Sequence, residues 1–197
     1  MYFIDKTIER ISRFFKFLLS KDFILSHKFQ NKNQVTNANF IINSLMIKNF
    51  VPKYIIDIGC GHGEWTKKLL RFYPNSKFFL FDADNTNLKK LENLKKEYNN
   101  IDYKICLLSD NENFYTFYNM GYGSSIFEEQ TSHARVQQKI KSTTLKKEIP
   151  DELKNYSNNL IKIDVQGAEL KVLEGLNELI NNFEVVILEV SVHEYNK

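Results

Sequence analysis

An apolar segment that stops at a cluster of glycines constrains the fold of this chain more than any other feature. Residues 54–58 read Tyr-Ile-Ile-Asp-Ile, and Gly59, Gly61 and Gly63 follow at every second position. Such a run suits a buried strand, and glycine lets the backbone turn sharply and approach a ligand closely. Residues 64–72 then carry apolar side chains at helical spacing. The segment therefore predicts a strand, a tight loop and a helix, with a crevice at the loop.

The rest of the chain continues this alternation of strands and helices. Further strands are expected at 77–81, 101–108, 160–165 and 185–190, and further helices at 87–98 and 168–180. Strands alternating with helices of this length imply right-handed crossovers and a mostly parallel sheet. We therefore expect an α/β fold, a doubly wound Rossmann-like sheet with helices on both faces.

Two regions depart from the alternation. Residues 1–50 are predicted to form a helical extension of the main domain at 51–197, because apolar residues recur every three or four positions over 3–25. That helix would pack on the core or on a second copy of the chain; an interfacial membrane helix is the less favoured alternative. Residues 111–157 form an insert of extended segments around a turn, which we expect beside the ligand.

Composition excludes several classes of protein. The 197 residues carry a net charge of only +3 with no block of basic residues, which argues against nucleic-acid binding. No segment approaches the roughly 18 consecutive apolar residues of a membrane span, and no signal peptide is recognisable. The two cysteines, Cys60 and Cys106, have neither pairing nor metal-ligand spacing. A cytoplasmic protein is expected.

The residues of the crevice indicate its ligand. The helix that follows the loop directs its amide groups and positive dipole end there, which suits a carboxylate. Asp82 ends the second strand, where a carboxylate can accept hydrogen bonds from ribose hydroxyls and would repel a phosphate. Glu64 stands where a dinucleotide fingerprint needs glycine or alanine. These features favour S-adenosylmethionine over a nicotinamide dinucleotide. The predicted cofactor contacts are Asp57, Gly59, Cys60, Gly61, Gly63, Asp82, Ser109 and Asp110.

Several further segments occur in the order typical of one family. They are Asp57-Ile58-Gly59, Phe81-Asp82, Leu107-Leu108-Ser109-Asp110, Gly123-Ser124-Ser125, Thr143-Thr144-Leu145, residues 160–169 (LIKIDVQGAE) and Leu188-Glu189-Val190. The chain thereby resembles FkbM-type methyltransferases over roughly residues 40–195. The resemblance implies the class I S-adenosylmethionine-dependent fold and O-methylation of a sugar, glycan or secondary metabolite. The chain departs from the usual family pattern at three points. It has Asp82-Ala83 where the family usually has Glu-Pro, and Lys146 where the family usually has an aspartate. It also ends at Lys197, before the strands that normally complete such a sheet.

Candidate catalytic residues lie at the ends of the last two predicted strands. Lys162 and Asp164 share one face of their strand, and Asp164 reaches its carboxyl end beside the crevice. We expect Asp164 to position or deprotonate the acceptor hydroxyl; a helix cap or a partner for Lys162 is the structural alternative. His193 is a further candidate base. The acids Asp164, Glu169 and Glu189 match no metal-ligand pattern, so no metal is predicted.

Three functions remain open on the sequence alone. The first is an S-adenosylmethionine-dependent O-methyltransferase acting on a glycan or small molecule. The second is an inactive or truncated methyltransferase-like subunit that only binds the cofactor. The third, a nicotinamide-dependent oxidoreductase, is disfavoured by Glu64.

Overall fold

The described part of the chain contains nearly all of the predicted main domain. In this computed structural model it comprises residues 24–26, 42, 45, 46, 48–121, 123–128 and 132–190. The predicted N-terminal helix lies outside these residues, except at its last positions, where Ile24–Ser26 form strand β1. Ile42, Leu45 and Met46 are helical and lie within the helical extension predicted at 1–50.

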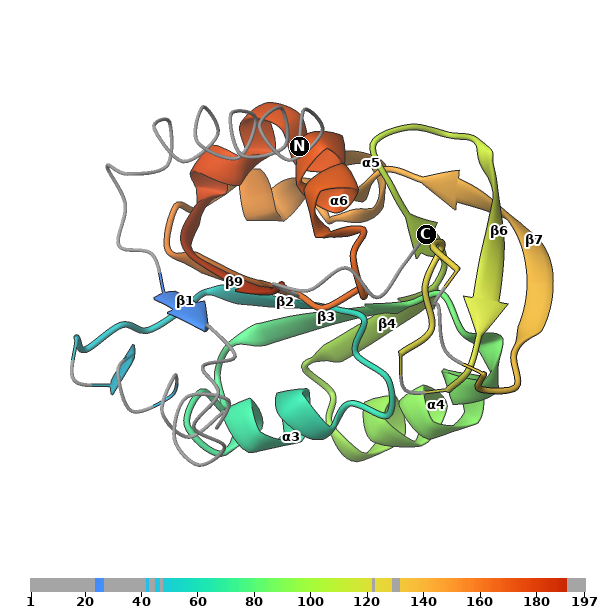
Figure 1. Ribbon diagram of the computed structural model, residues 1–197. Coiled ribbons are helices and arrows are strands. Elements are labelled where there is room, and N and C mark those ends of the chain that lie inside the picture. Colours follow the sequence, from blue (N-terminus) through green and yellow to red (C-terminus); the bar gives the residue numbers. More distant parts are fainter. Residues whose placement is uncertain are drawn as a thin grey trace.

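A six-stranded parallel sheet forms the centre of the domain (Figure 1). Its order is β1, β9, β8, β2, β3, β4. The remaining bounds are β2 Tyr54–Ile58, β3 Lys77–Asp82, β4 Ile101–Ile105, β8 Asn159–Ile163 and β9 Phe183–Glu189. The chain adds strands on one side of β2 and then crosses to the other, so the strand order reverses beside β2. This confirms the predicted doubly wound α/β fold.

Helices cover both faces of this sheet. Figure 1 shows α3 (Glu64–Leu70) and α4 (Leu88–Glu97) on one face, and α5 (Leu145–Glu148) and α6 (Glu169–Leu176) on the other. All five residues of β2 and of β8 are buried, as expected for central parallel strands. Short 3-10 turns occupy Asn85–Asn87, Asp151–Asn155 and Asn177–Asn182. Because the strands are parallel, their carboxyl ends lie together at one edge of the sheet.

The predicted third strand is divided in two, so its expected span of 101–108 was wrong. Its last hydrogen bond to β3 runs from the Cys106 amide to the Asp82 carbonyl, where β3 ends. The following backbone groups need new partners. Leu107–Leu108 accordingly form β5, which pairs with β7 (Val136–Thr143). The split turns the chain out of the main sheet and into the insert.

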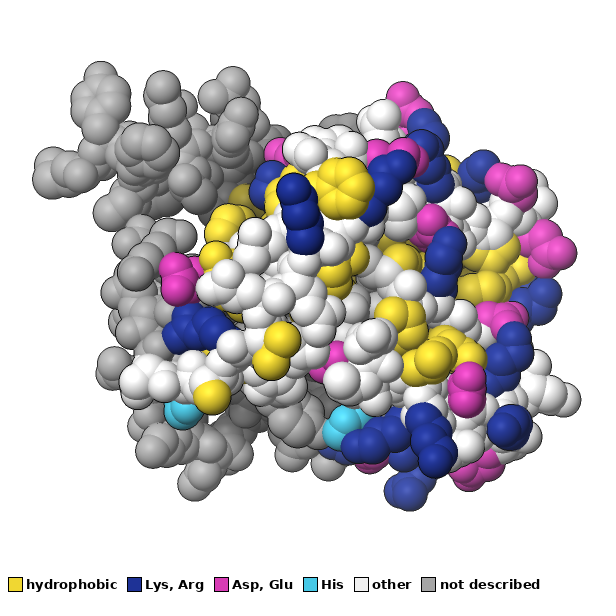
Figure 2. All heavy atoms as spheres, turned by 90° about the vertical axis from the view of Figure 1, so that its right-hand side faces the viewer, with side chains coloured by type: hydrophobic (Ala, Val, Ile, Leu, Met, Phe, Trp, Pro, Cys, Tyr) yellow, Lys and Arg dark blue, Asp and Glu magenta, His cyan; other side chains and the backbone are white. Residues whose placement is uncertain are grey.

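Together with β5, the insert forms a second, three-stranded sheet in the order β5, β7, β6. Strand β6 (Phe114–Asn119) pairs antiparallel with β7, which confirms the extended segments predicted there. Figure 2 views the molecule from this side: cationic and anionic side chains both occur across the face, with apolar side chains between them. Ion pairs of Glu112 with Lys141 and Lys147 contribute to this mixture. The insert therefore lies beside the edge of the main sheet where the strands' carboxyl ends meet, because residues of both line one cavity.

Candidate active site

A cavity of about 260 Å³ lies at the carboxyl ends of β2, β3 and β8. The sheet supplies one side of its lining and the insert supplies the other. The lining residues are 58–62, 64, 65, 81–84, 87, 106–108, 117, 121, 123–126, 162, 164–166 and 168. Ligands of open α/β sheets bind at such a position, where the strand order reverses. The fold therefore places the glycine loop, Asp82, Lys162 and Asp164 around one cavity.

The three glycines of the loop have different tasks. A Cβ atom on Gly59 would lie 1.8 Å from the Asp164 carbonyl oxygen, and one on Gly63 would lie 2.6 Å from Leu94 Cδ2. A Cβ on Gly61 would meet nothing within 4 Å, although all three residues have positive φ. Gly59 and Gly63 thus allow the loop to pack against the protein. Gly61 keeps the cavity side of the loop open.

This difference predicts unequal effects on stability. Gly59→Ala is expected to lower the free energy of unfolding by at least about 2 kcal/mol, because backbone must move to relieve the contact. Gly61→Ala, the matched control, meets only the strain of a positive φ, about 1 kcal/mol. Chemical denaturation of the two variants without ligand measures both values. Equal losses would contradict the role given to Gly59.

Asp82 organises the cavity wall opposite β8. Its Oδ2 accepts a hydrogen bond from the Gly61 amide at 2.7 Å, and its Oδ1 accepts from the Asp84 amide at 2.8 Å and from Asn87 Nδ2 at 3.2 Å. Burial raises the pKa of this carboxyl group, although these donors oppose the rise. Because Oδ2 accepts from one donor among the described residues, it retains capacity for a ligand hydroxyl.

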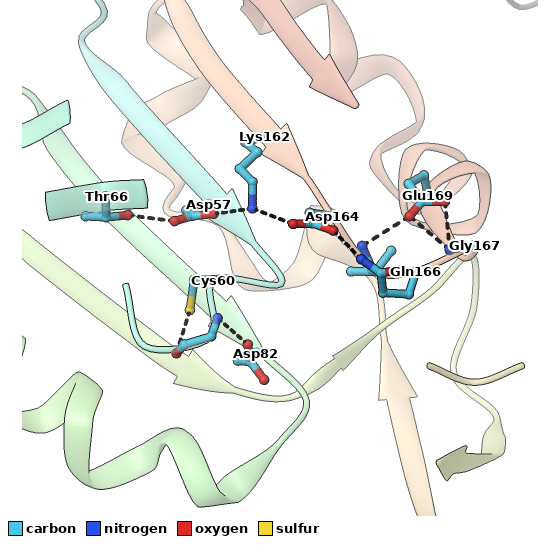
Figure 3. Close-up of polar contacts among 11 residues, drawn as sticks. Asp57, Cys60, Thr66, Asp82, Lys162, Asp164, Gln166, Gly167 and Glu169 are labelled. Atoms are coloured by element: carbon cyan, nitrogen blue, oxygen red, sulfur yellow. Dashed lines mark hydrogen bonds and ion pairs between the residues drawn. The ribbon is translucent and has the colours of Figure 1, made fainter. Parts of the chain in front are cut away.

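A buried chain of polar contacts crosses the sheet below the cavity (Figure 3). Thr66 Oγ1 donates to Asp57 Oδ2 at 2.7 Å, and Lys162 Nζ lies 3.4 Å from Asp57 Oδ1 and 3.2 Å from Asp164 Oδ2. Burial would lower the pKa of Lys162, but the two carboxylates more than offset this and raise it. Lys162 is therefore an ammonium that donates hydrogen bonds, and it cannot serve as a base near neutral pH.

The loop after β8 holds Asp164 from its other side. Gln166 Nε2 donates to Asp164 Oδ1 at 2.8 Å (Figure 3), and Ser125 Oγ of the insert donates to the Gln166 carbonyl at 2.7 Å. Glu169 accepts from the Val165 and Gly167 amides at 3.0–3.2 Å. Helix α6 is capped by Ala168 without a side-chain bond, so Asp164 is not its cap. Asp164 forms an ion pair with Lys162, and it also lines the cavity, so this contact does not decide between the structural and the catalytic role.

The other predicted residues are distributed unevenly around the cavity. Cys60 lines it, whereas Asp57 is fully buried beneath it. Ser109 and Asp110 lie outside the lining: Ser109 is fully buried, its amide bonds the Thr143 carbonyl, and its hydroxyl bonds Asp110. His193 falls outside the described residues.

Trp65, Cys106 and Phe117 are among the lining residues that the sequence did not identify. The Trp65 ring centroid lies 5.7 Å from Lys162 Nζ. Burial raises the pKa of Cys106 to about 12, so its thiol stays protonated. Phe117 is the buried residue of β6. Its burial depends on the pairing of β6 with β7, which the local sequence does not indicate.

Within the described ranges, no three or more histidine, cysteine, aspartate or glutamate side chains are grouped as a metal site would need. Nor does any helix in that part of the chain have the length and apolar character to cross a membrane.

Comparison with known proteins assigns the chain to a family. Residues 49–197 match the methyltransferase FkbM domain, which is most of the chain. The chain belongs to the FkbM methyltransferase family. Its match includes the glycine loop, Asp82 and the Lys162–Glu169 segment, the residues that surround the cavity. No curated protein matches this FkbM-family chain.

Two solved structures with low similarity to this FkbM-family chain are described as methyltransferases. One is coclaurine N-methyltransferase bound to N-methylheliamine and SAH, with 18% identity, 41% of this chain covered and a TM-score of 0.28. Another, from Galdieria sulphuraria, is described as a sarcosine dimethylglycine methyltransferase, with 14% identity, 50% covered and a TM-score of 0.32. The matches span 25% and 44% of those two chains. Structural similarity this low carries no argument about the residues of the cavity.

Proposed function

We propose that this chain is an S-adenosylmethionine-dependent O-methyltransferase that acts on a hydroxyl of a sugar, glycan or secondary metabolite. One observation carries the proposal: Asp82 and the Lys162–Asp164 pair line the same cavity at the switch point of the sheet. The first suits a ribose, and the second suits an acceptor hydroxyl. Membership of the FkbM family supports methyl transfer as the reaction.

The residues around the loop fit the cofactor. Gly61 leaves open space where a Cβ would stand, and Asp82 Oδ2 retains acceptor capacity for a ribose hydroxyl. Apolar side chains of Phe81, Cys106 and Leu107 continue the lining from Asp82 toward the insert. Such a mixed wall, largely apolar with few polar groups, is usual for nucleoside sites. These residues would hold the adenosine part of the cofactor.

The protein's own part in the reaction is to place and deprotonate the acceptor. The chemistry that the cofactor supplies when bound is an electrophilic methyl group on a sulfonium, which leaves as a neutral thioether. Asp164, with one side-chain donor on each oxygen, accepts the proton of the acceptor hydroxyl. Lys162 holds Asp164 in place and balances part of the negative charge. Ser124, Ser125 and Ile126 of the insert line the remaining space, where the acceptor would lie.

The cofactor assignment predicts a specific loss on changing Asp82. Asp82→Asn is expected to weaken S-adenosylmethionine binding about ten- to a hundredfold, because hydrogen bonds to a charged acceptor contribute about 1.5–3 kcal/mol. Isothermal titration calorimetry measures this, with NAD as the competing ligand. Tighter binding of NAD by the unaltered protein would favour the oxidoreductase instead. The melting temperature of the variant controls for the hydrogen bonds that Asp82 makes within the loop.

Transfer itself is tested with methyl-labelled S-adenosylmethionine and a panel of free sugars, glycosides and phenols. Label in an acid-stable methyl ether is the expected result. Binding of the cofactor with no transfer to any member of the panel would favour the inactive cofactor-binding subunit.

A further inference from the structure

The charge below the cavity is unbalanced. Asp57 and Asp164 contribute two carboxylates, and Lys162 contributes one ammonium between them. Asp57 is fully buried, and the side chains of Lys162 and Asp164 are only 10% and 21% exposed. The hydroxyl of Thr66, which completes the chain of contacts, is neutral. The group therefore carries one net negative charge in a place where water screens it poorly.

The rest of the lining does not cancel this charge. Lys162 is the only lysine or arginine of the lining among the described residues, whereas Glu64, Asp82, Asp84 and Asp164 all contribute to it. Glu64 is largely exposed and pairs with Lys67 outside the cavity, so it matters least. Aromatic side chains of Trp65, Phe81 and Phe117 complete the wall, and aromatic faces also attract cations. The cavity is thus suited to a cationic ligand.

The two forms of the proposed cofactor differ in charge. S-adenosylmethionine carries a carboxylate, an ammonium and a sulfonium, so it has one net positive charge. Its demethylated product has lost the sulfonium and is neutral overall. A base that accepts the acceptor's proton lies within hydrogen-bond reach of the acceptor oxygen, which must approach the methyl carbon to about 3 Å. The sulfonium is therefore a near neighbour of Asp164 in the proposed reaction.

We propose that the Asp57–Lys162–Asp164 group recognises the sulfonium charge, so that the cavity binds S-adenosylmethionine more tightly than S-adenosylhomocysteine. The inference rests on the proposed function. The raised pKa of Lys162 keeps its ammonium in the group, so the net charge stays at one negative charge near neutral pH. Methyl transfer removes the attraction, which makes the product easier to release. The group thus sets the preference for substrate cofactor over product as well as aligning the base.

Calorimetry with three ligands tests this inference without an acceptor. The ligands are S-adenosylmethionine, S-adenosylhomocysteine and sinefungin, an analogue that carries an amine in the region of the sulfonium. The unaltered protein is expected to bind the two cationic ligands about tenfold more tightly than S-adenosylhomocysteine, because the cost of removing the cation from water offsets most of its attraction to one unit charge a few ångströms away. Asp164→Asn is expected to remove most of that preference and to change S-adenosylhomocysteine affinity by less than about twofold.

Asp82→Asn is the matched control, since it changes the same residue type in the same cavity on the ribose side. It should weaken all three ligands, and it should change their affinity ratio much less than Asp164→Asn does, because Asp82 lies on the ribose side of the cavity. Equal affinity of the unaltered protein for S-adenosylmethionine and S-adenosylhomocysteine would overturn the inference, and that comparison needs no variant. The inference would also be overturned if Asp164→Asn had the melting temperature of the unaltered protein and the same ratio of affinities for S-adenosylmethionine and S-adenosylhomocysteine. Binding of none of the three ligands would instead contradict the proposed cofactor, and the inference with it.

Discussion

Asp164→Asn is expected to reduce methyl transfer about a hundred- to ten-thousandfold at saturating S-adenosylmethionine, the usual contribution of a positioned general base. The asparagine has the size of aspartate but cannot take up the acceptor's proton. Its Oδ1 can still accept from Gln166, while its Nδ2 would face the Lys162 ammonium, donor against donor. The first-order rate constant in a single turnover, followed with methyl-labelled cofactor, isolates this step from cofactor binding.

Asp151→Asn is the matched control for this variant. Asp151 is 91% exposed and pairs with Lys154 in the turn before β8, on a surface that does not line the cavity. Its rate constant should equal that of the unaltered protein. A second comparison uses the acidity of the acceptor: a nitrophenol needs less help from a base than a sugar hydroxyl does. The loss in Asp164→Asn should therefore be smaller with the phenol, and equal losses with both acceptors would contradict the role of Asp164 as the base.

Local patterns in the sequence were sufficient to predict most of the fold. The run at 54–58, the alternate glycines and the helix after them are dictated by neighbouring residues, and the structure has each at its expected place. Strands β3, β8 and β9 follow from their apolar runs in the same way. The division between β4 and β5 could not be predicted, because it depends on where β3 ends and on pairing with β7, some thirty residues later in the chain.

The candidate site was predictable where one strand or loop positions it, as for Asp82, Lys162 and Asp164, all of which line the cavity. Side chains brought in by long-range packing were not. Ser109 and Asp110 follow the third predicted strand in sequence, but pairing with β7 and the close approach of Gly175 to the Ser109 carbonyl hold them against α6 instead. The spacing of the glycines also predicts too much for the ligand: Gly59 and Gly63 are required by packing within the protein, and only Gly61 of the three leaves open space where a Cβ would stand.

Lys162→Met is expected to lower the free energy of unfolding by about 3–5 kcal/mol, the usual cost of breaking a buried ion pair from one side. Methionine fills a similar volume, so the loss reflects charge more than a cavity. Without the ammonium, Asp57 keeps the Thr66 hydroxyl as its only side-chain donor among the described residues, while remaining fully buried beside a second carboxylate. Chemical denaturation without cofactor measures the loss. Lys154→Met, which removes an exposed ion pair, should cost less than about 1 kcal/mol.

A second substitution separates the charge from the shape of Lys162. In Asp57→Asn/Lys162→Met a neutral amide replaces the buried carboxylate that Lys162→Met alone would leave without its ammonium. Burying an amide costs far less free energy than burying an uncompensated carboxylate. The double variant should therefore be more stable than Lys162→Met alone, although it differs from the unaltered protein at one more position. If the stability losses of the single variants Asp57→Asn and Lys162→Met simply add in the double variant, Lys162 acts through packing. Asp57 and Asp164 then do not depend on its charge for compensation. Recovery of stability in the double variant would show that the Lys162 ammonium stabilises the protein by compensating the two carboxylates that meet below this cavity.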